Sequence, residues 1–200
     1  MKIVFAGTPA FAAEHLLILL KGDHKIVSVL TQPDRKSGRG KKTSFSAVKE
    51  VAIENKLKVL QPESLKNTET LSILHDLKPD IILVVAYGLL IPKLVLELPN
   101  LGCINLHASL LPRWRGAAPI ESCIAAGDAK SGITMMRMSK GLDEGPILKK
   151  FMCDLDDKET LGTLEDKFIN ISSKNLLQFL DDYEEKKIKE VPQPRTGSTY

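Results

Sequence analysis

The sequence predicts an α/β fold of the Rossmann-like, three-layer kind, with a mostly parallel twisted sheet and a late antiparallel hairpin. Short apolar runs alternate with helix-compatible segments through the first half of the chain, which is a βαβ rhythm. One run, Ile81 to Val85, is apolar at every position, as in a parallel strand that helices cover on both faces. Two later strand-like runs, Gly132 to Met138 and Ile147 to Cys153, flank a Gly-rich connection and predict the hairpin.

The remaining elements follow in chain order. Lys2 to Phe5 predicts a strand that ends at Gly7, and Pro9 to Leu20 carries helix-compatible apolar residues. The period of the long segment Leu161 to Glu184 predicts an amphipathic helix that packs against the sheet. Between these lie strands expected at Lys25–Leu30, Lys58–Leu60, Asp80–Val85 and Gly102–Leu106, and helices expected at Ser46–Asn55, Thr68–Leu77 and Pro119–Ala126.

Composition places the chain among globular proteins. Of its 200 residues, 43% are hydrophobic and 26% are charged, and the apolar stretch Leu16 to Leu20 is far shorter than the ~20 residues that a bilayer requires. Met1-Lys2 leads into a strand pattern rather than a signal peptide. We therefore expect a cytoplasmic protein with no membrane partner. A monomer is expected as well, although composition does not determine it.

The three cysteines predict reduced, buried thiols. They form no C-x-x-C pair, and no histidine stands at metal-ligand spacing from them, so no metal site is expected. A nucleophilic Cys103, four residues before His107, is the alternative.

Asn105, His107 and Asp143 are the candidate site. The two-residue period of a strand places Asn105 and His107 on one side, and Asp143 lies in a Gly-rich loop. A carboxamide N–H and an imidazole N–H can both donate to an oxyanion, while a carboxylate orients the ring and favours its charged form. This indicates acyl-type chemistry without a nucleophile, because Ser109 lacks a G-x-S-x-G setting. The alternatives are a packed histidine and an aspartate that only forms a turn.

Two motif observations concern ligands. The first turn, Ala6 to Pro9, matches neither G-x-G-x-x-G nor a P-loop, which argues against dinucleotide binding and against a P-loop nucleotide site. Between Pro33 and Glu50 the sequence is locally basic. This fits either a solvated loop or a segment that binds nucleic-acid phosphates. The basic residues are Arg35, Lys36, Arg39, Lys41, Lys42 and Lys49, against Asp34 and Glu50.

Four motifs carry a family resemblance: Val4 to Pro9; Thr31 to Arg35 with Gly38 to Lys42; Val85 to Gly88 with Ile91-Pro92; and Asn105 to Pro119 with Gly141 to Asp143. With them the chain resembles, from Met1 to about Glu184, the catalytic domain of the methionyl-tRNA formyltransferases, within the folate-dependent formyltransferase superfamily. The Asn105 group is shared with glycinamide ribonucleotide and sugar-nucleotide formyltransferases. The basic loop and the run Arg113 to Pro119 resemble the tRNA enzymes.

The resemblance implies a role for each motif. Asn105, His107 and Asp143 would be catalytic, the formyl donor would be 10-formyltetrahydrofolate, and the acceptor would be the α-amine of initiator methionyl-tRNA, with no metal. The implied folate contacts are Tyr87, Gly88, Leu89, Leu90, Ser109, Leu110, Leu111 and Pro112. The implied tRNA contacts are Arg35, Arg39, Lys41 and Lys42.

The resemblance also implies an organisation. Residues 1–184 would form the formyltransferase domain, and the polar, Pro-containing residues 185–200 a linker toward a C-terminal tRNA-binding barrel that is absent from this chain. Trp114 is expected to be a core residue beside Pro112. Two other functions stay open: a formyltransferase for a small amine such as glycinamide ribonucleotide, and a catalytically silent module that binds folate or tRNA.

Overall fold

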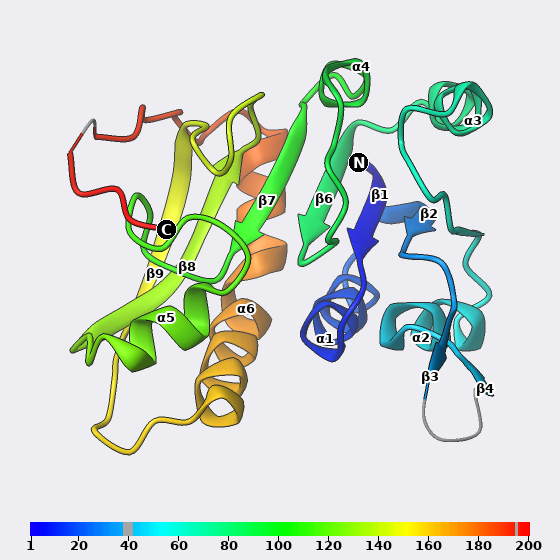
Figure 1. Cartoon of the computed structure of the whole chain (residues 1–200). Coiled ribbons are helices and arrows are strands. Elements are labelled where there is room, and N and C mark those ends of the chain that lie inside the picture. The colour runs from blue at the N-terminus through cyan, green and yellow to red at the C-terminus, as the bar shows by residue number, and fades with distance from the viewer. Residues whose placement is uncertain (38–41, 195) are drawn as a thin grey trace. The chain divides into compact units, whose positions relative to one another are not determined.

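A computed structural model describes residues 1–37, 42–194 and 196–200. The chain divides into two compact units, Met1–Cys103 and Ile104–Tyr200 (Figure 1).

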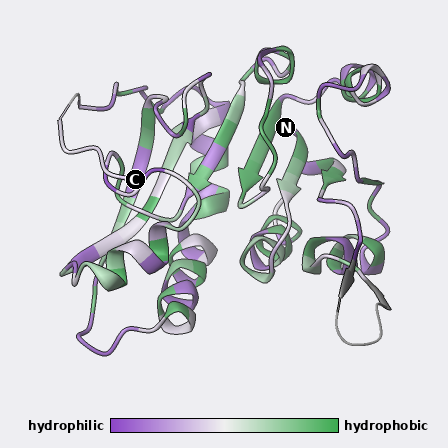
Figure 2. Ribbon diagram, viewed as in Figure 1, coloured by the Kyte–Doolittle hydropathy of each residue, from purple (hydrophilic) through white to green (hydrophobic). Residues whose placement is uncertain are grey.

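The first unit is built on four parallel strands, β1 (Lys2–Gly7), β2 (Lys25–Leu30), β5 (Val59–Leu60) and β6 (Ile81–Val85). They are hydrogen-bonded in the order β5-β2-β1-β6. Every residue of β6 is buried, and Figure 2 shows both β1 and β6 as hydrophobic ribbons. The predicted parallel sheet is thus confirmed, and the carboxyl ends of its strands meet at one edge.

Four helices complete this unit: α1 (Ala10–Leu19), α2 (Ala47–Glu54), α3 (Thr68–Leu77) and the single turn α4 (Lys93–Leu96). Side chains fix the starts of two of them, since Ser46 accepts from the N–H of Lys49 and Asn67 accepts from the N–H groups of Glu69 and Thr70. The sequence did not predict α4, because one turn is too short to show a helical period.

The basic segment after β2 differs from the loop that the sequence suggested. Arg35–Ser37 and Lys42–Ser44 pair as two antiparallel strands, β3 and β4. Strands of three residues show too little alternation to be recognised in a sequence. The predicted tRNA contacts Arg39 and Lys41 lie outside the described residues.

The second unit contains β7 (Cys103–His107), which begins at the last residue of the first unit, followed by β8 (Lys130–Arg137) and β9 (Ile147–Asp154). The pairs β7–β8 and β8–β9 are antiparallel, so the late hairpin is confirmed. Helix α5 (Pro119–Ala125) packs against α6 (Leu161–Glu184), which has the predicted bounds. A capping box at Thr160 begins α6, and its apolar face buries Leu164, Phe168, Leu176 and Leu180. No helix in the described part of the chain is both long enough and apolar enough to cross a membrane.

A histidine lies in the core of the first unit. His15 on α1 is fully buried, its ring lies 4.5 Å from that of Phe11, and its Nδ1 donates to the Phe11 carbonyl at 2.6 Å. Burial disfavours the charged ring and lowers the pKa of His15 from 6.5 to about 4.

This pKa predicts an acid-dependent loss of stability. Between pH 6.5 and about 4 the unfolded chain binds a proton that the folded chain rejects, so the free energy of unfolding should fall across this window, by up to about 3 kcal/mol. Above pH 6.5 the ring is neutral in both states and makes no pH-dependent contribution. Urea unfolding of the protein and of His15→Leu, measured from pH 7 to pH 4, checks this.

The variant should lose less free energy of unfolding over that window than the unaltered protein does. His75→Leu is the matched control, because the His75 side chain is 77% exposed. Parallel pH dependences for the protein and for His15→Leu would contradict the assignment.

Candidate functional site

The site begins at the carboxyl end of β7. Asn105 pairs with Met136 and His107 with Thr134 across the β7–β8 ladder, and the two-residue spacing points both side chains to one face. Asn105 is half-buried, and His107 is only 5% exposed. The strand ends at His107, one residue beyond the predicted end. The imidazole therefore belongs to the last residue of the strand before the loop.

Asp143 lies in the connection between β8 and β9. The N–H of Arg137 donates to the Pro146 carbonyl at 3.0 Å and closes this connection at its base. Gly145 is required there, because a Cβ on it would lie 1.8 Å from the Arg137 carbonyl oxygen. Asp143 itself has a φ of 49°, a left-handed backbone that a non-glycine residue keeps only when its surroundings impose it.

The structure brings the three predicted residues together through the carboxylate. Asn105 Nδ2 donates to Asp143 Oδ1 at 3.1 Å, and the backbone N–H of Gly116 donates to Oδ2 at 2.9 Å. His107 Nδ1 lies 3.7 Å from Oδ2. The Asp143 side chain is 10% exposed, so these charge-assisted contacts act in a partly desolvated setting.

The second nitrogen of the imidazole has a partner that the sequence did not reveal. His107 Nε2 and the carbonyl oxygen of Trp114 are 2.7 Å apart. A carbonyl can only accept, so Nε2 carries the proton and donates. Nδ1 is consequently the ring nitrogen that remains for chemistry, on the side where Asp143 lies.

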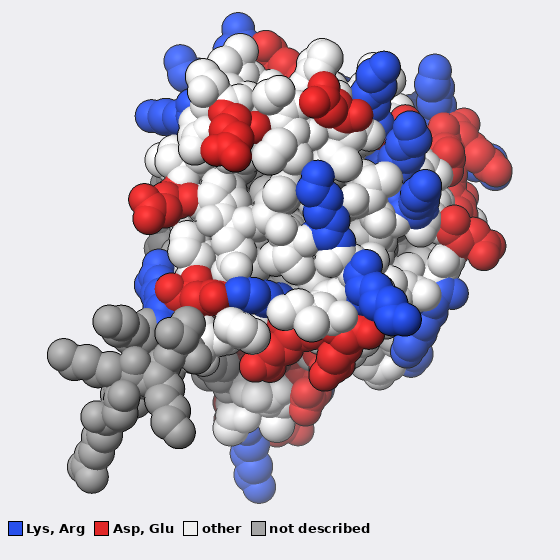
Figure 3. Space-filling model, turned by 90° about the vertical axis from the view of Figure 1, so that its right-hand side faces the viewer, with Lys and Arg blue, Asp and Glu red and all other residues white. Residues whose placement is uncertain are grey.

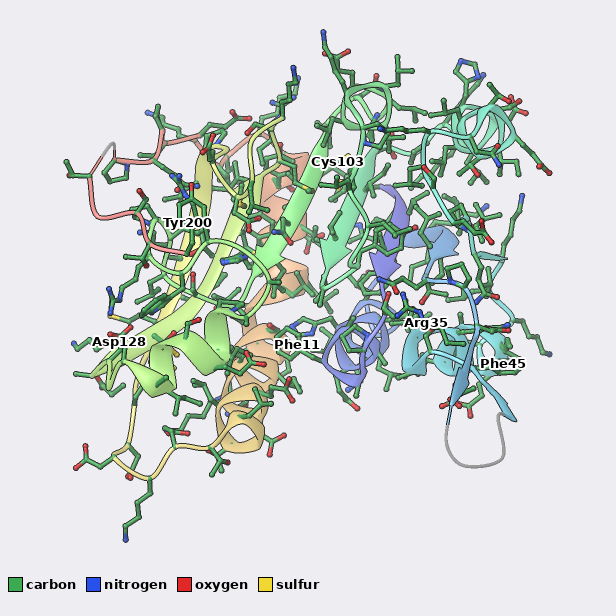
Figure 4. The ribbon with its side chains drawn as sticks, viewed as in Figure 1. Phe11, Arg35, Phe45, Cys103, Asp128 and Tyr200 are labelled. Atoms are coloured by element: carbon green, nitrogen blue, oxygen red, sulfur yellow. The ribbon has the colours of Figure 1, made fainter. Side chains whose placement is uncertain are left out.

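The loop that supplies this carbonyl is anchored by an ionic cluster. Arg113 donates to Asp128 through Nε at 2.9 Å and Nη2 at 2.7 Å, and the indole N–H of Trp114 donates to Asp128 at 2.7 Å (Figure 4 labels Asp128). The hydrogen bonds from Arg113 and Trp114 hold the pKa of Asp128 below its usual value. Trp114 has a φ of 60° and is only partly buried, so the expectation of a core tryptophan is not met.

The turn Ser109 to Pro112, predicted to contact folate, is hydrogen-bonded to β8. Thr134 Oγ1 donates to the Ser109 carbonyl at 2.6 Å and accepts from the N–H of Leu111 at 3.1 Å. Ser109 is fully buried and its hydroxyl donates to the Arg113 carbonyl at 2.6 Å, while Leu111 packs on Met136 and Ile147. Leu110 and Pro112 are the partly exposed members of the turn.

The other predicted folate contacts lie in the first unit, after β6. The Tyr87 carbonyl accepts from Thr8 Oγ1 at 2.8 Å and from Gln32 Nε2 at 3.2 Å. The Tyr87 hydroxyl is buried and has no hydrogen-bond partner among the residues described, and burial raises the pKa of this phenol. Gly88 has a φ of 81°, Leu89 is partly buried, and Leu90 is 86% exposed, an unusual exposure for leucine.

Within the described side chains of the basic segment, one lysine has an acidic partner. Lys49 pairs with Asp34 at 2.6 Å, and the hydrogen bonds from Lys49 and Gln61 lower the pKa of Asp34. Arg35 is exposed and donates to Gln32 Oε1 at 2.7 Å, while Lys42 is described only through its backbone in β4. On the face in Figure 3, the coloured side chains include both basic and acidic residues.

The cysteines are buried or half-buried. Cys103 and Cys123 are buried and donate to the carbonyls of Val95 and Ile120, and Cys153 is half-buried. Burial raises the pKa of the Cys123 and Cys153 thiols, which disfavours the nucleophilic thiolate. Within the described ranges no three His, Cys, Asp or Glu side chains are grouped so that they could hold a metal ion.

The chain is thus an open-sheet α/β protein with polar side chains gathered at the carboxyl end of β7, and in such proteins ligands bind at that edge of the sheet. The sequence model of the family "Formyl transferase" matches residues 1–180, and the chain belongs to this family.

Curated relatives resemble the chain in sequence, and solved structures resemble it in fold. The chain is 51% identical over 200 residues to the methionyl-tRNA formyltransferase of Idiomarina loihiensis, covering 63% of that protein. Phosphoribosylglycinamide formyltransferase from Bacillus halodurans superposes on 94% of the chain (97% of its own) with a TM-score of 0.77 and 19% identity. An N-formyltransferase from Helicobacter canadensis, solved with folinic acid and dTDP-3-aminofucose, superposes on all of the chain (70% of its own) with a TM-score of 0.75 and 20% identity. The chain thus spans less than two thirds of its curated relatives, and the solved structures confirm the Rossmann-like fold.

Sequence reasoning missed three contributors to the site: the Trp114 carbonyl, the Gly116 N–H and the side chain of Gln193. The first two are backbone groups, which every residue possesses, so no side-chain pattern could indicate them. Gln193 donates to the carbonyls of Asp143 and Gly145 at 2.8 Å each. Its only signal was a polar residue between two prolines in a segment interpreted as linker.

Replacing Thr134 should destabilise the protein. Thr134→Val keeps the shape of the side chain but leaves the Ser109 carbonyl and the Leu111 N–H without their shared partner in a fully buried position. The free energy of unfolding should fall by about 3 kcal/mol, measured by urea denaturation. The control is Thr68→Val at the exposed start of α3, which should change it by less than about 0.5 kcal/mol. Equal effects of the two substitutions would refute this role for Thr134.

Proposed function

We propose that the chain transfers a formyl group from 10-formyltetrahydrofolate to the α-amine of initiator methionyl-tRNA. The observation that carries the proposal is the cluster in which Asp143 holds Asn105 at 3.1 Å and faces the His107 ring at 3.7 Å. Membership of the formyl transferase family and 51% identity to a methionyl-tRNA formyltransferase support it.

In this proposal the amine attacks the formyl carbon directly. The carbonyl π electrons move to oxygen and form an oxyanion. Asn105 Nδ2 has two hydrogens and gives one to Asp143, so the second is available to the oxyanion. His107 donates the other hydrogen bond from protonated Nδ1, because Nε2 is committed to Trp114. Donors aimed at the developing charge lower the barrier of such a step.

Collapse of the tetrahedral intermediate then releases tetrahydrofolate. The bond from the formyl carbon to the folate nitrogen breaks and its electron pair stays on that nitrogen. The proton lost by the attacking amine reaches the folate nitrogen through water or His107. Asp143 keeps the imidazole in one orientation throughout, and no covalent enzyme intermediate forms.

The described residues suit a folate in two respects. Leu90 is 86% exposed, and an exposed apolar side chain of this kind can contact the flat pterin ring. The buried Tyr87 hydroxyl without a partner is a polar atom that a ligand or an ordered water can satisfy. The stretches Tyr87–Leu90 and Ser109–Pro112 remain the proposed folate contacts.

A small amine acceptor such as glycinamide ribonucleotide is the second candidate. The Bacillus halodurans phosphoribosylglycinamide formyltransferase shares the fold at 19% identity, and such a likeness concerns the fold alone. The basic residues Arg35, Arg39, Lys41 and Lys42 favour the tRNA acceptor, since they would contact phosphates. A silent binding module is disfavoured by the assembled Asn105, His107 and Asp143.

The same proposal implies a domain organisation, a place of action and an oligomeric state. Residues 1–184 act as the formyltransferase domain, and residues 185–200 lead toward a tRNA-binding barrel. The protein works as a monomer in the cytoplasm, where initiator tRNA is charged and used.

His107→Ala should lower the rate of formyl transfer by about 10² or more, because it removes one donor to the oxyanion. The measurement is single-turnover formylation of methionyl initiator tRNA with saturating 10-formyltetrahydrofolate. His75→Ala, which alters an exposed histidine on α3, is the control and should keep the full rate. An undiminished rate in His107→Ala would remove the proposed mechanism.

The acceptor is tested separately through the basic segment. Arg39→Ala should reduce the rate with methionyl initiator tRNA far more than the rate with a small amine. It should also reduce the slope of log affinity for tRNA against log salt concentration, by about 0.7 to 0.9 for each phosphate that the variant no longer binds. Lys174→Ala on the exposed face of α6 is the matched control. Equal reductions with both acceptors would exclude a tRNA role for Arg39.

A further inference from the structure

The residues after α6 return to the candidate site within the second unit. Val191 and Ile147 form an isolated antiparallel bridge in which each N–H donates to the other carbonyl at 2.8 Å. Ile147 is the first residue of β9, directly after the Asp143 connection. Two residues later, Gln193 reaches that connection with its side chain.

The carboxamide of Gln193 uses all of its hydrogen-bonding directions on two loops. Its Nε2 donates to the Asp143 and Gly145 carbonyls, each at 2.8 Å. Its Oε1 accepts from Arg115 Nη2 at 2.8 Å and Nε at 3.3 Å. The Arg115 side chain is only 9% exposed, so this contact is largely shielded from water.

Thr199 binds the same Arg113–Gly116 loop from the other end of the segment. Its Oγ1 accepts from the N–H of Trp114 at 2.8 Å, and its carbonyl accepts from the N–H of Arg115 at 2.9 Å. Tyr200, labelled in Figure 4, adds a long contact of 3.5 Å from Arg115 Nη1 to its hydroxyl. The segment therefore contacts both loops that face the His107 ring.

These two loops carry the two oxygen atoms that face the imidazole nitrogens. Asp143 faces Nδ1 at 3.7 Å, and the Trp114 carbonyl accepts from Nε2 at 2.7 Å. Both residues have positive φ values, 49° and 60°, which the chain keeps only if neighbouring contacts impose them. Gln193 binds the backbone of the first, and Thr199 binds the backbone of the second.

We propose that residues 191–194 and 196–200, named the C-terminal brace, fix the orientation of His107 and the proton on its Nε2 by holding the Asp143 connection and the Trp114 loop that face its ring. Gln193 is a positioning residue for the formyl transfer proposed above, because it acts through Asp143 and touches no reacting atom. This inference deepens the proposed function and rests on it for its kinetic part only.

Gln193→Glu is the discriminating variant. It keeps the size of the side chain and the oxygen that accepts from Arg115, but it replaces both N–H donors with an acceptor that opposes the Asp143 and Gly145 carbonyls. The value of kcat for formyl transfer should fall about 10- to 100-fold, while KM for the donor and for the acceptor stays within about twofold. Gln178→Glu, the same change at an exposed position of α6, should leave both parameters unaltered.

Thr199 gives an independent pair of variants. Thr199→Val removes the hydroxyl that accepts from Trp114 and should lower kcat, whereas Thr199→Ser keeps the hydroxyl and should restore most of the rate. This pair keeps the brace testable if Gln193→Glu fails to fold.

A spectroscopic readout separates the brace from the proposed reaction. Long-range ¹H–¹⁵N spectra report which ring nitrogen carries the proton in each of the four histidines, and His107→Asn identifies the His107 signals. In the neutral form of the ring, the unaltered protein should show the proton on Nε2, and Gln193→Glu and Thr199→Val should show exchange between the two tautomers. Unchanged His107 signals in both variants would overturn the brace, even if kcat falls. Absence of formyl transfer by the unaltered protein would overturn the proposed function and leave this spectral test standing.

Discussion

The carboxylate of Asp143 is the group on which the second unit's candidate site depends. Its two oxygens accept from the Asn105 side chain and from the Gly116 backbone, and one of them faces the His107 ring. These partners come from the end of β7, from the loop before α5 and from the connection between β8 and β9. A neutral residue of the same shape could accept only some of these contacts, and its attraction for a charged imidazole would be lost. The carboxylate thus defines both the geometry and the electrostatics of the cluster.

Sequence reasoning identified the features that depend on the spacing of apolar residues and on residue type. The spacing of Asn105 and His107 placed both side chains on one face of a strand, and the apolar period gave the bounds of α6 (Leu161–Glu184). The parallel strands and the late hairpin followed from burial patterns of the same kind. Such features are local, so a single stretch of sequence contains the information for them.

What the sequence could not supply are contacts made by the backbone and contacts between distant segments. The proton on His107 Nε2 is fixed by the carbonyl of Trp114, and the left-handed φ of Trp114 is imposed by the surrounding fold rather than preferred by tryptophan. Residues 191–200 have the composition of a linker, yet Gln193 contacts a loop 48 to 50 residues away in sequence. Composition describes average behaviour and carries no information on a particular hydrogen bond between distant residues. The short β3–β4 pair was missed for a related reason, since three residues show no usable alternation.

The arginines in the run from Arg113 to Pro119 bind other parts of the protein itself. The resemblance sets this run apart as typical of the tRNA enzymes. In the structure the guanidinium of Arg113 makes two hydrogen bonds to Asp128, and Arg115 donates to Gln193 and lies 3.5 Å from Glu144. Two of the five N–H donors of Arg113 are thus used within the protein, and those two must give up their bonds to Asp128 before they can bind another acceptor. In the structure the run therefore presents the Trp114 carbonyl to His107, and its two arginines fix that loop through hydrogen bonds to Asp128 and Gln193.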